Sequence, residues 1–334
     1  MPLEDFRKEF IATVPKFERT PNADSLNFSG NEKTIDKESQ NIKNISKQNY
    51  QKPSVGTIIG GVIAGATVQG LIEVPHHLAA PQIIKKMKKI SNSISTEEIT
   101  QVEKAISDTL KNSGLEEKGV NIIKATEENS EEITKIMGKE IDKGILKYLP
   151  KQVKELVGNI FSSQMSAGQN ACYTFASKKI IMPEKELKLA FFHEAGHAMN
   201  ANLSKIGKIL QKLRATTLLT LPISMIALWK TKKAPGEEPK NNLDKTTTFI
   251  KDNAGKLTFA ACLPMLTEEG LATIKGNKYA KKLLSPELAR KVAKTNAFGF
   301  STYMLIATLS SLGIYLGTKV KDSIAHKKLV AENN

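Results

Sequence analysis

Two histidines four residues apart, in His193-Glu194-Ala195-Gly196-His197, constrain the fold more than any other part of this sequence. Positions i and i+4 lie on the same face of an α-helix, so both imidazoles can bind one metal ion. Glu194 follows the first histidine, from where its carboxylate can reach a water molecule on that ion. Zinc accepts imidazole and carboxylate ligands and leaves one position open for water. The motif therefore predicts a helix that binds one Zn²⁺ per chain, with Glu194 as the general base.

The residues around the motif favour a buried helix. The approach from Leu187 to Phe192 is largely apolar, and Gly196 and Ala198 keep the helix narrow beside the metal. The alternative is a surface helix that carries two histidines on a polar face. Because the chain has only five histidines, this spacing is improbable by chance.

A pair of short strands is expected within residues 168–183, with a turn at Ser177-Lys178. Strands that come just before the motif helix would form an edge of its cleft. An extended peptide can add to such an edge through backbone hydrogen bonds. Asn170, Ala171 and Cys172 are therefore the candidate strand for substrate binding.

The third metal ligand is not fixed by the motif. Catalytic zinc sites usually have three protein ligands, and the only later histidine, His326, lies near the end of the sequence. We therefore expect an acid as the third ligand. Glu268 and Glu269 both qualify, because they follow an apolar stretch where a buried helix can carry them to the site.

Three pieces of the sequence together resemble the membrane-bound gluzincin metallopeptidases, which include the HtpX heat-shock proteases and the CAAX prenyl endopeptidases. The pieces are Asn170-Ala171, the His193–His197 motif and Glu269-Gly270-Leu271-Ala272. The resemblance covers roughly residues 95–295. It selects Glu269 over Glu268, because the glutamate ligand of this family lies in a similar E-x-x-A setting. Thr273 stands where the family usually has an aspartate, which puts the family's additional carboxylate near the metal ligands in doubt.

The resemblance also implies a fold and further site residues. The fold would be mainly α with a small β edge (α+β), a zincin-like metallopeptidase domain with transmembrane helices beside the cleft. The family often has an additional His, Tyr or Arg that stabilises the oxyanion. Tyr279 and Arg290 are the candidates for this role. The substrate would be a polypeptide, with membrane proteins among the candidates.

Two uncharged or nearly uncharged segments predict membrane spans, a glycine-rich one at 54–81 and another at 296–318. Small residues four apart, such as Gly61 and Gly65 or Gly313 and Gly317, suit close helix packing in lipid. Gly56 and Gly60 share this spacing. The alternative for the first segment is a glycine-rich hairpin buried in a soluble protein. Two shorter apolar stretches, at about 215–229 and 257–266, are expected to form an antiparallel hairpin, either in the membrane or in a core.

The expected domain order follows from these segments. A polar, disordered tail (1–53) precedes the first span, a zinc metallopeptidase domain (95–295) includes the apolar hairpin, and a polar tail (319–334) follows the last span.

The net charge of +15 suits anionic lipid, and we expect no nucleic-acid partner because no nucleic-acid motif is present. Basic residues near the spans favour the cytoplasmic side for the site. The expected location is the inner membrane of a bacterium.

The function expected from the sequence is a membrane-associated, zinc-dependent endopeptidase. Two alternatives come from particular features. Thr273, in place of the family aspartate, supports a membrane-anchored scaffold or binding protein with a degenerate site. The glycine-rich span and the basic segments support a membrane-remodelling protein.

Overall fold

The computed structural model describes residues 53–143, 151–167, 169–184, 187–233 and 237–331. The expected N-terminal tail (1–53) therefore lies outside the described residues, except for its last residue. The described chain is mostly helical and contains a small three-stranded sheet. This confirms the coarse fold class, mainly α with a small β edge.

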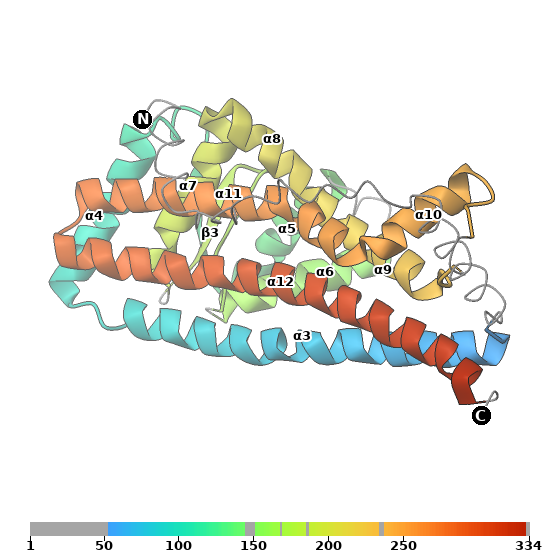
Figure 1. The fold of residues 1–334 in the computed structure, drawn as a ribbon. Helices are drawn as coiled ribbons and strands as arrows, with labels where there is room; N and C mark the ends of the chain where they lie inside the picture. Colours follow the sequence, from blue (N-terminus) through green and yellow to red (C-terminus); the bar gives the residue numbers. More distant parts are fainter. Residues whose placement is uncertain (1–52, 144–150, 168, 185–186, 234–236, 332–334) are drawn as a thin grey trace, which may run out of the picture. The chain divides into compact units, whose positions relative to one another are not determined.

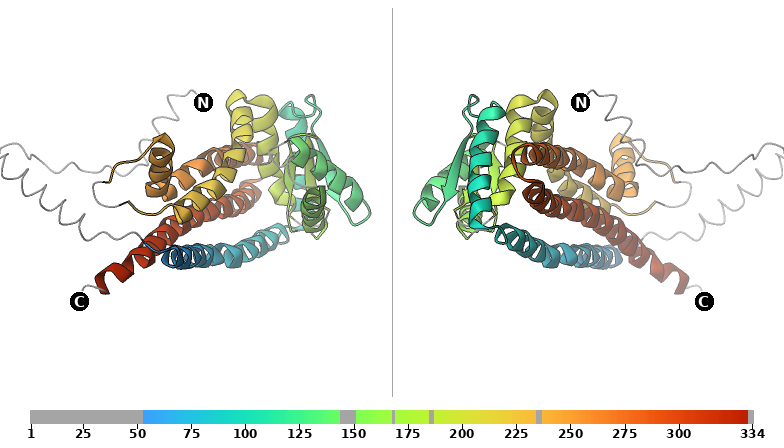
Figure 2. Two further views of the ribbon diagram at one scale, coloured as in Figure 1. Left: turned by 90° about the vertical axis from the view of Figure 1, so that its right-hand side faces the viewer. Right: turned by 90° about the vertical axis from the view of Figure 1, so that its left-hand side faces the viewer.

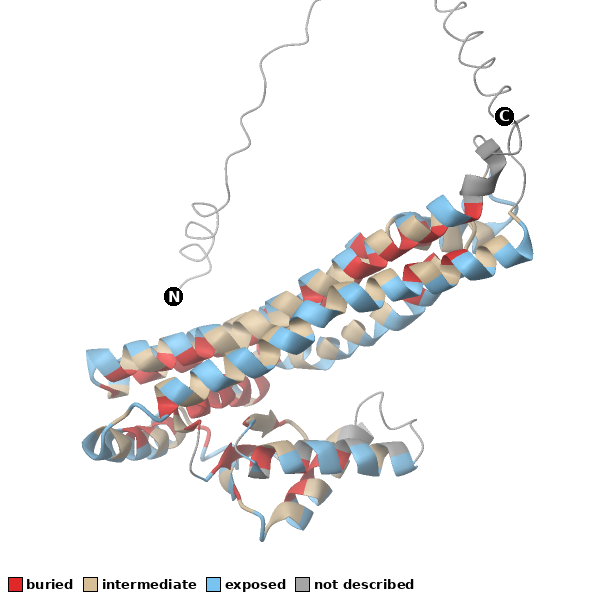
Figure 3. Ribbon diagram, turned by 90° about the horizontal axis from the view of Figure 1, so that it is seen from below, coloured by how far each residue is buried: buried red, intermediate tan, exposed pale blue. Residues whose placement is uncertain are grey.

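Two long helices, α3 (Val55–Ser91) and α12 (Pro286–Ala331), lie side by side and antiparallel (Figure 1). By length and composition, these two helices of the described chain can cross a membrane. Only 11% of the most apolar 18-residue window of α3 and 17% of that of α12 is buried, so both retain apolar surface (Figure 3). Segment 54–81 is thus part of one continuous helix and not a buried hairpin. Helix α12 extends beyond segment 296–318 at both ends and continues into the predicted polar tail.

Glycines let the backbones of α3 and α12 approach closely. A Cβ at Gly65 would lie 2.6 Å from the carbonyl oxygen of Gly317, and one at Gly317 would lie 2.5 Å from that of Gly65. Gly61 and Gly313 face the backbone of the opposite helix in the same way. The prediction of close packing is therefore confirmed for these four residues. A Cβ at Gly60, by contrast, would meet nothing within 4 Å.

The sheet has β3 (Lys179–Pro183) at its centre. It pairs in parallel with β1 (Asn121–Ala125) and antiparallel with β2 (Cys172–Thr174). The expected turn at Ser177-Lys178 joins β2 to β3, with Lys178 at a φ of 53°. Helices α5 (Ser130–Lys143) and α6 (Lys151–Ser166) contact the strands, whereas α4 (Thr96–Asn112) contacts the motif helix and α11 (Figure 2).

The motif helix, α7, runs from Phe191 to Leu203 and is preceded by a 3₁₀ turn, η2 (Lys188–Ala190). It begins later than the sequence indicates, because Leu187 adopts a left-handed conformation with a φ of 57°. Phe191 and Phe192 are fully buried in the largest core cluster, which also draws residues from α4, β3, α11 and α12. The predicted burial of this helix is confirmed.

The segment after α7 folds into five further elements: α8 (Lys205–Leu213), η3 (Arg214–Leu219), α9 (Thr220–Trp229), α10 (Asn242–Asp252) and α11 (Ala254–Leu283). Elements η3 and α9 run antiparallel to the first half of α11. The hydroxyl of Thr216 donates a 2.7 Å hydrogen bond to the carbonyl oxygen of Ala261, and Ala227 packs against Ala254. The two shorter apolar stretches are therefore neighbours, as expected, but the second continues as one helix through Glu268 and Glu269.

The contact between α3 and α12 predicts opposite effects for two alanine substitutions in one helix. Gly65→Ala places a methyl group against the backbone of α12 and should destabilise the protein by about 1–3 kcal/mol. Gly60→Ala faces open space, so it should leave the stability unchanged or raise it by up to about 1 kcal/mol, because alanine favours a helix more than glycine does. Thermal unfolding of detergent-solubilised protein measures both. Equal midpoints for the two variants would contradict the observed packing.

Candidate metal centre

Three nitrogen and oxygen atoms from α7 and α11 form a compact buried triangle. Nε2 of His193 lies 3.1 Å from Nε2 of His197 and 3.0 Å from Oε2 of Glu269. The third side, from Nε2 of His197 to Oε2 of Glu269, is 3.3 Å. All three side chains are buried. The structure therefore brings together the two histidines of the motif and an acid from a helix far along the chain.

The size of this triangle fits a metal ion. Ligand atoms about 2.0–2.1 Å from a tetrahedrally coordinated ion lie about 3.3–3.4 Å apart, because the edge of a tetrahedron is about 1.6 times the bond length. The observed sides of 3.0, 3.1 and 3.3 Å are close to that value. Glu194 also has a carboxylate oxygen within 4.8 Å of a nitrogen of each histidine. This buried group of histidine and glutamate side chains can hold a metal ion.

Glu268 has a different place from Glu269, although the two are consecutive. Its Oε1 lies 2.9 Å from Nδ1 of His197, on the side of the ring away from the triangle. The side-chain amides of Asn200 and Gln211 each donate a hydrogen bond of 3.0 Å to the same oxygen. A carboxylate that accepts the other N–H of a histidine ligand fixes the tautomer and the orientation of its ring. The geometry therefore favours Glu269 as the ligand and Glu268 as the residue that orients His197.

Thr273 is the corresponding hydrogen-bond partner of the other histidine, His193. Its Oγ1 lies 3.2 Å from Nδ1 of His193, one helical turn beyond Glu269 on α11. A hydroxyl oxygen can accept the Nδ1–H hydrogen bond, as a carboxylate would. Thr273 therefore gives His193 a polar partner.

Backbone contact between α7 and α11 sets the separation of the ligands. A Cβ at Gly196 would lie 2.1 Å from the carbonyl oxygen of Ala272, and one at Gly276 would lie 2.1 Å from that of Phe192. Neither position has room for a side chain. Since the two glycines lie on opposite helices, each helix presents bare backbone to the other, and the glutamates of α11 reach the histidines of α7 directly.

Charges within the cluster shift the pKa values of its members. Burial lowers the pKa of His197, but the carboxylates of Glu269 and Glu268 outweigh this effect and raise it to about 10. Burial opposes ionisation of Glu268, yet His197 and Arg214 lower its pKa to about 2. Burial raises the pKa of Glu194, and the two histidines only partly offset this. In the absence of a metal ion, a proton on His197 and the guanidinium of Arg214 together balance the two ionised carboxylates.

An arginine and a tyrosine lie at the cluster, but they are not the predicted ones. Tyr279 packs into the main core, about 15 Å beyond Glu269 along α11, and Arg290 is exposed on α12. Instead, Arg214 of η3 places Nη1 2.8 Å from Oε2 of Glu268 and Nη2 2.7 Å from Oε1 of Glu269. The structure therefore places Tyr279 and Arg290 away from the cluster, and their role in oxyanion stabilisation stays untested.

Sequence reasoning missed Arg214, Tyr303, Asn200 and Gln211. The guanidinium carbon of Arg214 lies 5.9 Å from the ring centre of Tyr303, which comes from α12. Signals existed for two of the four: Arg214 is the charge that opens the apolar stretch 215–229, and Asn200 follows His197 by about one helical turn. Tyr303 had no such signal, because only the tertiary fold brings α12 to the site.

A cavity of about 360 Å³ adjoins the triangle and includes His193 and Glu194 in its wall. Asn170 and Ala171, from the predicted substrate strand, also line it, whereas Cys172 packs against Met165. The rest of the wall comes largely from the two long helices: His76, Ala80, Ile84 and Met87 of α3, and Thr295, Asn296, Gly299, Thr302, Tyr303 and Ile306 of α12. A ligand in this cavity would therefore touch α3, α12 and the candidate general base together.

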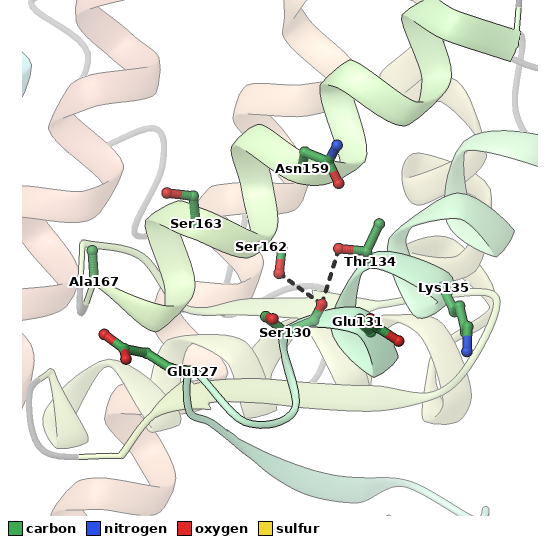
Figure 4. A pocket seen from close by; sticks show the side chains of 9 residues that line it. All are labelled: Glu127, Ser130, Glu131, Thr134, Lys135, Asn159, Ser162, Ser163 and Ala167. Atoms are coloured by element: carbon green, nitrogen blue, oxygen red, sulfur yellow. Dashed lines mark hydrogen bonds between the residues drawn. The ribbon is translucent and has the colours of Figure 1, made fainter.

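A larger cavity of about 600 Å³ lies between α5 and α6 (Figure 4). Its described lining residues include no histidine or cysteine. Two of its hydroxyls, those of Thr134 and Ser162, both donate 2.9 Å hydrogen bonds to the carbonyl oxygen of Ser130. Neither of the two groups of histidine and acidic side chains that could hold a metal ion among the described residues lies in this cavity.

Comparison with known proteins identifies no relative. No family model, curated protein or solved structure matches the chain. The centre is therefore interpreted from its own geometry.

The glycine contacts predict that metal binding depends on the spacing of α7 and α11. Gly276→Ala forces α11 away from Phe192 and should lower metal affinity about 10–100-fold or more, because the ligand triangle opens. Gly270→Ala is the matched control on the same helix, since its Cβ would meet only a ring carbon of Phe300 at 3.9 Å. Metal content of the purified variants, measured by mass spectrometry, separates them. Equal metal content in both would contradict this role of Gly276.

The raised pKa of His197 predicts that metal uptake releases a proton. Around neutral pH the metal-free imidazole is protonated, and an ion can bind only the neutral form, so about one proton per ion should leave. Metal affinity should therefore rise with pH until the pH passes the pKa of His197. Calorimetry in buffers of different ionisation enthalpy counts the protons. Metal binding without any proton release would show that His197 is already neutral.

Proposed function

We propose that this chain is a membrane-associated, zinc-dependent endopeptidase with His193, His197 and Glu269 as the zinc ligands. One observation carries the proposal: three buried ligand atoms at metal-binding distances lie beside Glu194 at the wall of a cavity. Two imidazoles and one carboxylate are a ligand set of catalytic zinc sites. The polar partners of both histidines add support, because metal-ligating histidines commonly have them.

Zinc and Glu194 would have different roles in peptide hydrolysis. Zinc, when bound, would act as a Lewis acid on the scissile carbonyl and would make water acidic. Glu194 takes the proton from the attacking water and can deliver it to the leaving amine. Burial raises the pKa of Glu194, which brings this carboxylate closer to the basicity that a general base needs near neutral pH.

The substrate can be held in extended form at the edge of the sheet. Strand β2 is the outer strand on the side of α7, and the adjacent Asn170 and Ala171 line the cavity. An added strand would form backbone hydrogen bonds regardless of its sequence. Arg214 and Tyr303 lie close enough to the triangle to replace Tyr279 and Arg290 as candidates for oxyanion stabilisation.

A zincin-like fold of the membrane gluzincin type accounts for these features. Ala272 of the E-x-x-A segment meets Gly196 of the motif, and Thr273 contacts His193 where the family has an aspartate. This contact favours an active enzyme over a scaffold with a degenerate site. The cavity lies between α3 and α12, which supports polypeptide substrates at the bilayer, membrane proteins among them.

The lysines around α3 are the observation that favours a cytoplasmic site, and the inner membrane of a bacterium stays the location expected from the sequence. The basic end of α3, with Lys85, Lys86, Lys88 and Lys89, lies beside the start of α12, and Lys86 sits 5.8 Å from the ring centre of Phe298. The cavity opens in this part of the helix pair. Basic residues next to spans mark the cytoplasmic side.

Substitution of each acid should separate catalysis from metal binding. Glu194→Gln is expected to lower kcat for an unfolded polypeptide about 10²–10⁴-fold with zinc still bound, because only the proton acceptor is lost. Glu269→Ala should lose zinc and activity together, and Glu268→Gln should retain zinc at reduced affinity. Peptide release and zinc content of each purified variant are the measurements.

Two residues outside the site provide controls. Tyr279→Phe and Arg290→Ala should hydrolyse the substrate as the unmodified chain does, whereas Tyr303→Phe should be slower. Folded protein that binds no zinc, or hydrolysis that survives Glu194→Gln, would overturn the proposed function.

A further inference from the structure

Helix α8, directly after the motif helix, exposes three large apolar side chains in a row. Ile206, Ile209 and Leu213 are 60%, 57% and 42% exposed. They lie three and four residues apart, so they share one face of the helix. Unlike scattered surface residues, they form a continuous apolar strip.

A row of lysines runs beside this strip. Lys205, Lys208 and Lys212 are all exposed, each one residue before a member of the strip, and α8 contains no acid. Lysine stems can cover apolar surface while their ammonium groups reach outward to anions. Apolar residues on one face with adjacent lysines are the pattern of a helix that lies in the plane of an anionic membrane surface.

A further face of α8 packs against residues of the metal centre and of α7. A Cβ at Gly207 would lie 2.6 Å from the carbonyl oxygen of Asn200. The amide of Gln211 donates to Glu268 and, at 3.2 Å, to the carbonyl oxygen of His197. These contacts fix the rotation of the helix about its axis, so the apolar strip cannot turn inward.

The apolar surface continues along the chain towards the two long helices. Leu218, Leu219 and Leu221 are exposed in η3 and α9, followed by Met225 and Trp229. Helix α9 contacts both α3 and α12, which are long and apolar enough to cross a membrane. Exposed apolar residues therefore recur along the chain from α8 to α9, the helix that contacts the candidate spans. Figure 1 shows the positions of α8 and α9 in the fold.

We propose that α8 is an interfacial helix that docks on an anionic lipid surface. Ile206, Ile209 and Leu213 would enter the boundary between headgroups and acyl chains, and the three lysines would contact lipid phosphates. Charge favours lipid over a second copy of the chain, because a copy would bring the same lysines against each other. Docking would hold the metal centre, through Gln211, beside the headgroups.

Tryptophan fluorescence can test this docking on the full chain. The sequence has a single tryptophan, so a Trp229→Phe background allows Ile209→Trp to report on α8 alone. The protein is reconstituted in phosphatidylcholine vesicles with or without phosphatidylglycerol, and the quencher is lipid brominated near the headgroup end of its acyl chains. Quenching of Ile209→Trp is expected to exceed that of Lys104→Trp, an exposed position on α4, at least about twofold in anionic vesicles.

Charge reversal identifies the role of the lysines. Lys205→Glu, Lys208→Glu and Lys212→Glu together should lower the quenching in anionic vesicles at least about twofold, because each lysine contributes to attraction at an anionic surface. The same change at Lys104, Lys111 and Lys118, which lie on and just after α4, should not affect it. Quenching no greater than at position 104, or equal quenching with and without phosphatidylglycerol, would overturn the proposal. Tryptophan emission from Ile209→Trp that is blue-shifted but not quenched would indicate a protein partner, and this result would also overturn the proposal.

These variants distinguish a failure of the docking proposal from a failure of the proposed enzymatic function. Glu194→Gln should dock as well as the unmodified chain, whereas the triple lysine variant should keep its zinc. Loss of zinc from the unmodified chain would count against the proposed enzyme and leave the fluorescence result standing.

Discussion

The backbone contact between α7 and α11 is the constraint on which the metal centre depends. Gly196 and Gly276 leave each helix without a side chain where it meets the other, so the carbonyl groups of Ala272 and Phe192 fill the space that a methyl group would need. Buried glutamates on one helix can then reach histidines on the other without strain. Ordinary helix packing, with axes about 8–10 Å apart, would leave larger side chains between them.

Two consecutive glutamates serve two different purposes because successive residues of a helix point about 100° apart. Glu269 faces the ring nitrogens that can hold an ion, and Glu268 faces the opposite side of His197, where Asn200, Gln211 and Arg214 surround it. Arg214 contacts both carboxylates and offsets their charge. Each of the two buried acids thus has a cationic or donor partner, which offsets part of the desolvation cost of burying them side by side.

The sequence predicts what local spacing determines. The histidine pair on one helix face, the turn between β2 and β3 and the small-residue spacing that suits close helix contact all follow from residues near each other in the chain. Tyr303 has no signal in the sequence, and the place of Arg214 beside both carboxylates depends on which face η3 turns towards α7. Tyr279 and Arg290 lie away from the cluster for the same reason: a sequence shows the chemical type of a side chain, but not the direction in which the fold turns it.

An ion held by both α7 and α11 would join positions 76 residues apart, from His193 to Glu269. It would cross-link the two ends of the intervening loop, which contains α8, η3, α9 and α10. On the chain-entropy model, closing a loop of this length raises the free energy of the unfolded chain by about 4.5 kcal/mol, much as a disulfide does. The cysteines of this chain offer no such bridge, since Cys172 and Cys262 are both free. Metal binding would therefore affect two properties: the chemistry of the site, and the stability of the α8–α10 segment against local unfolding.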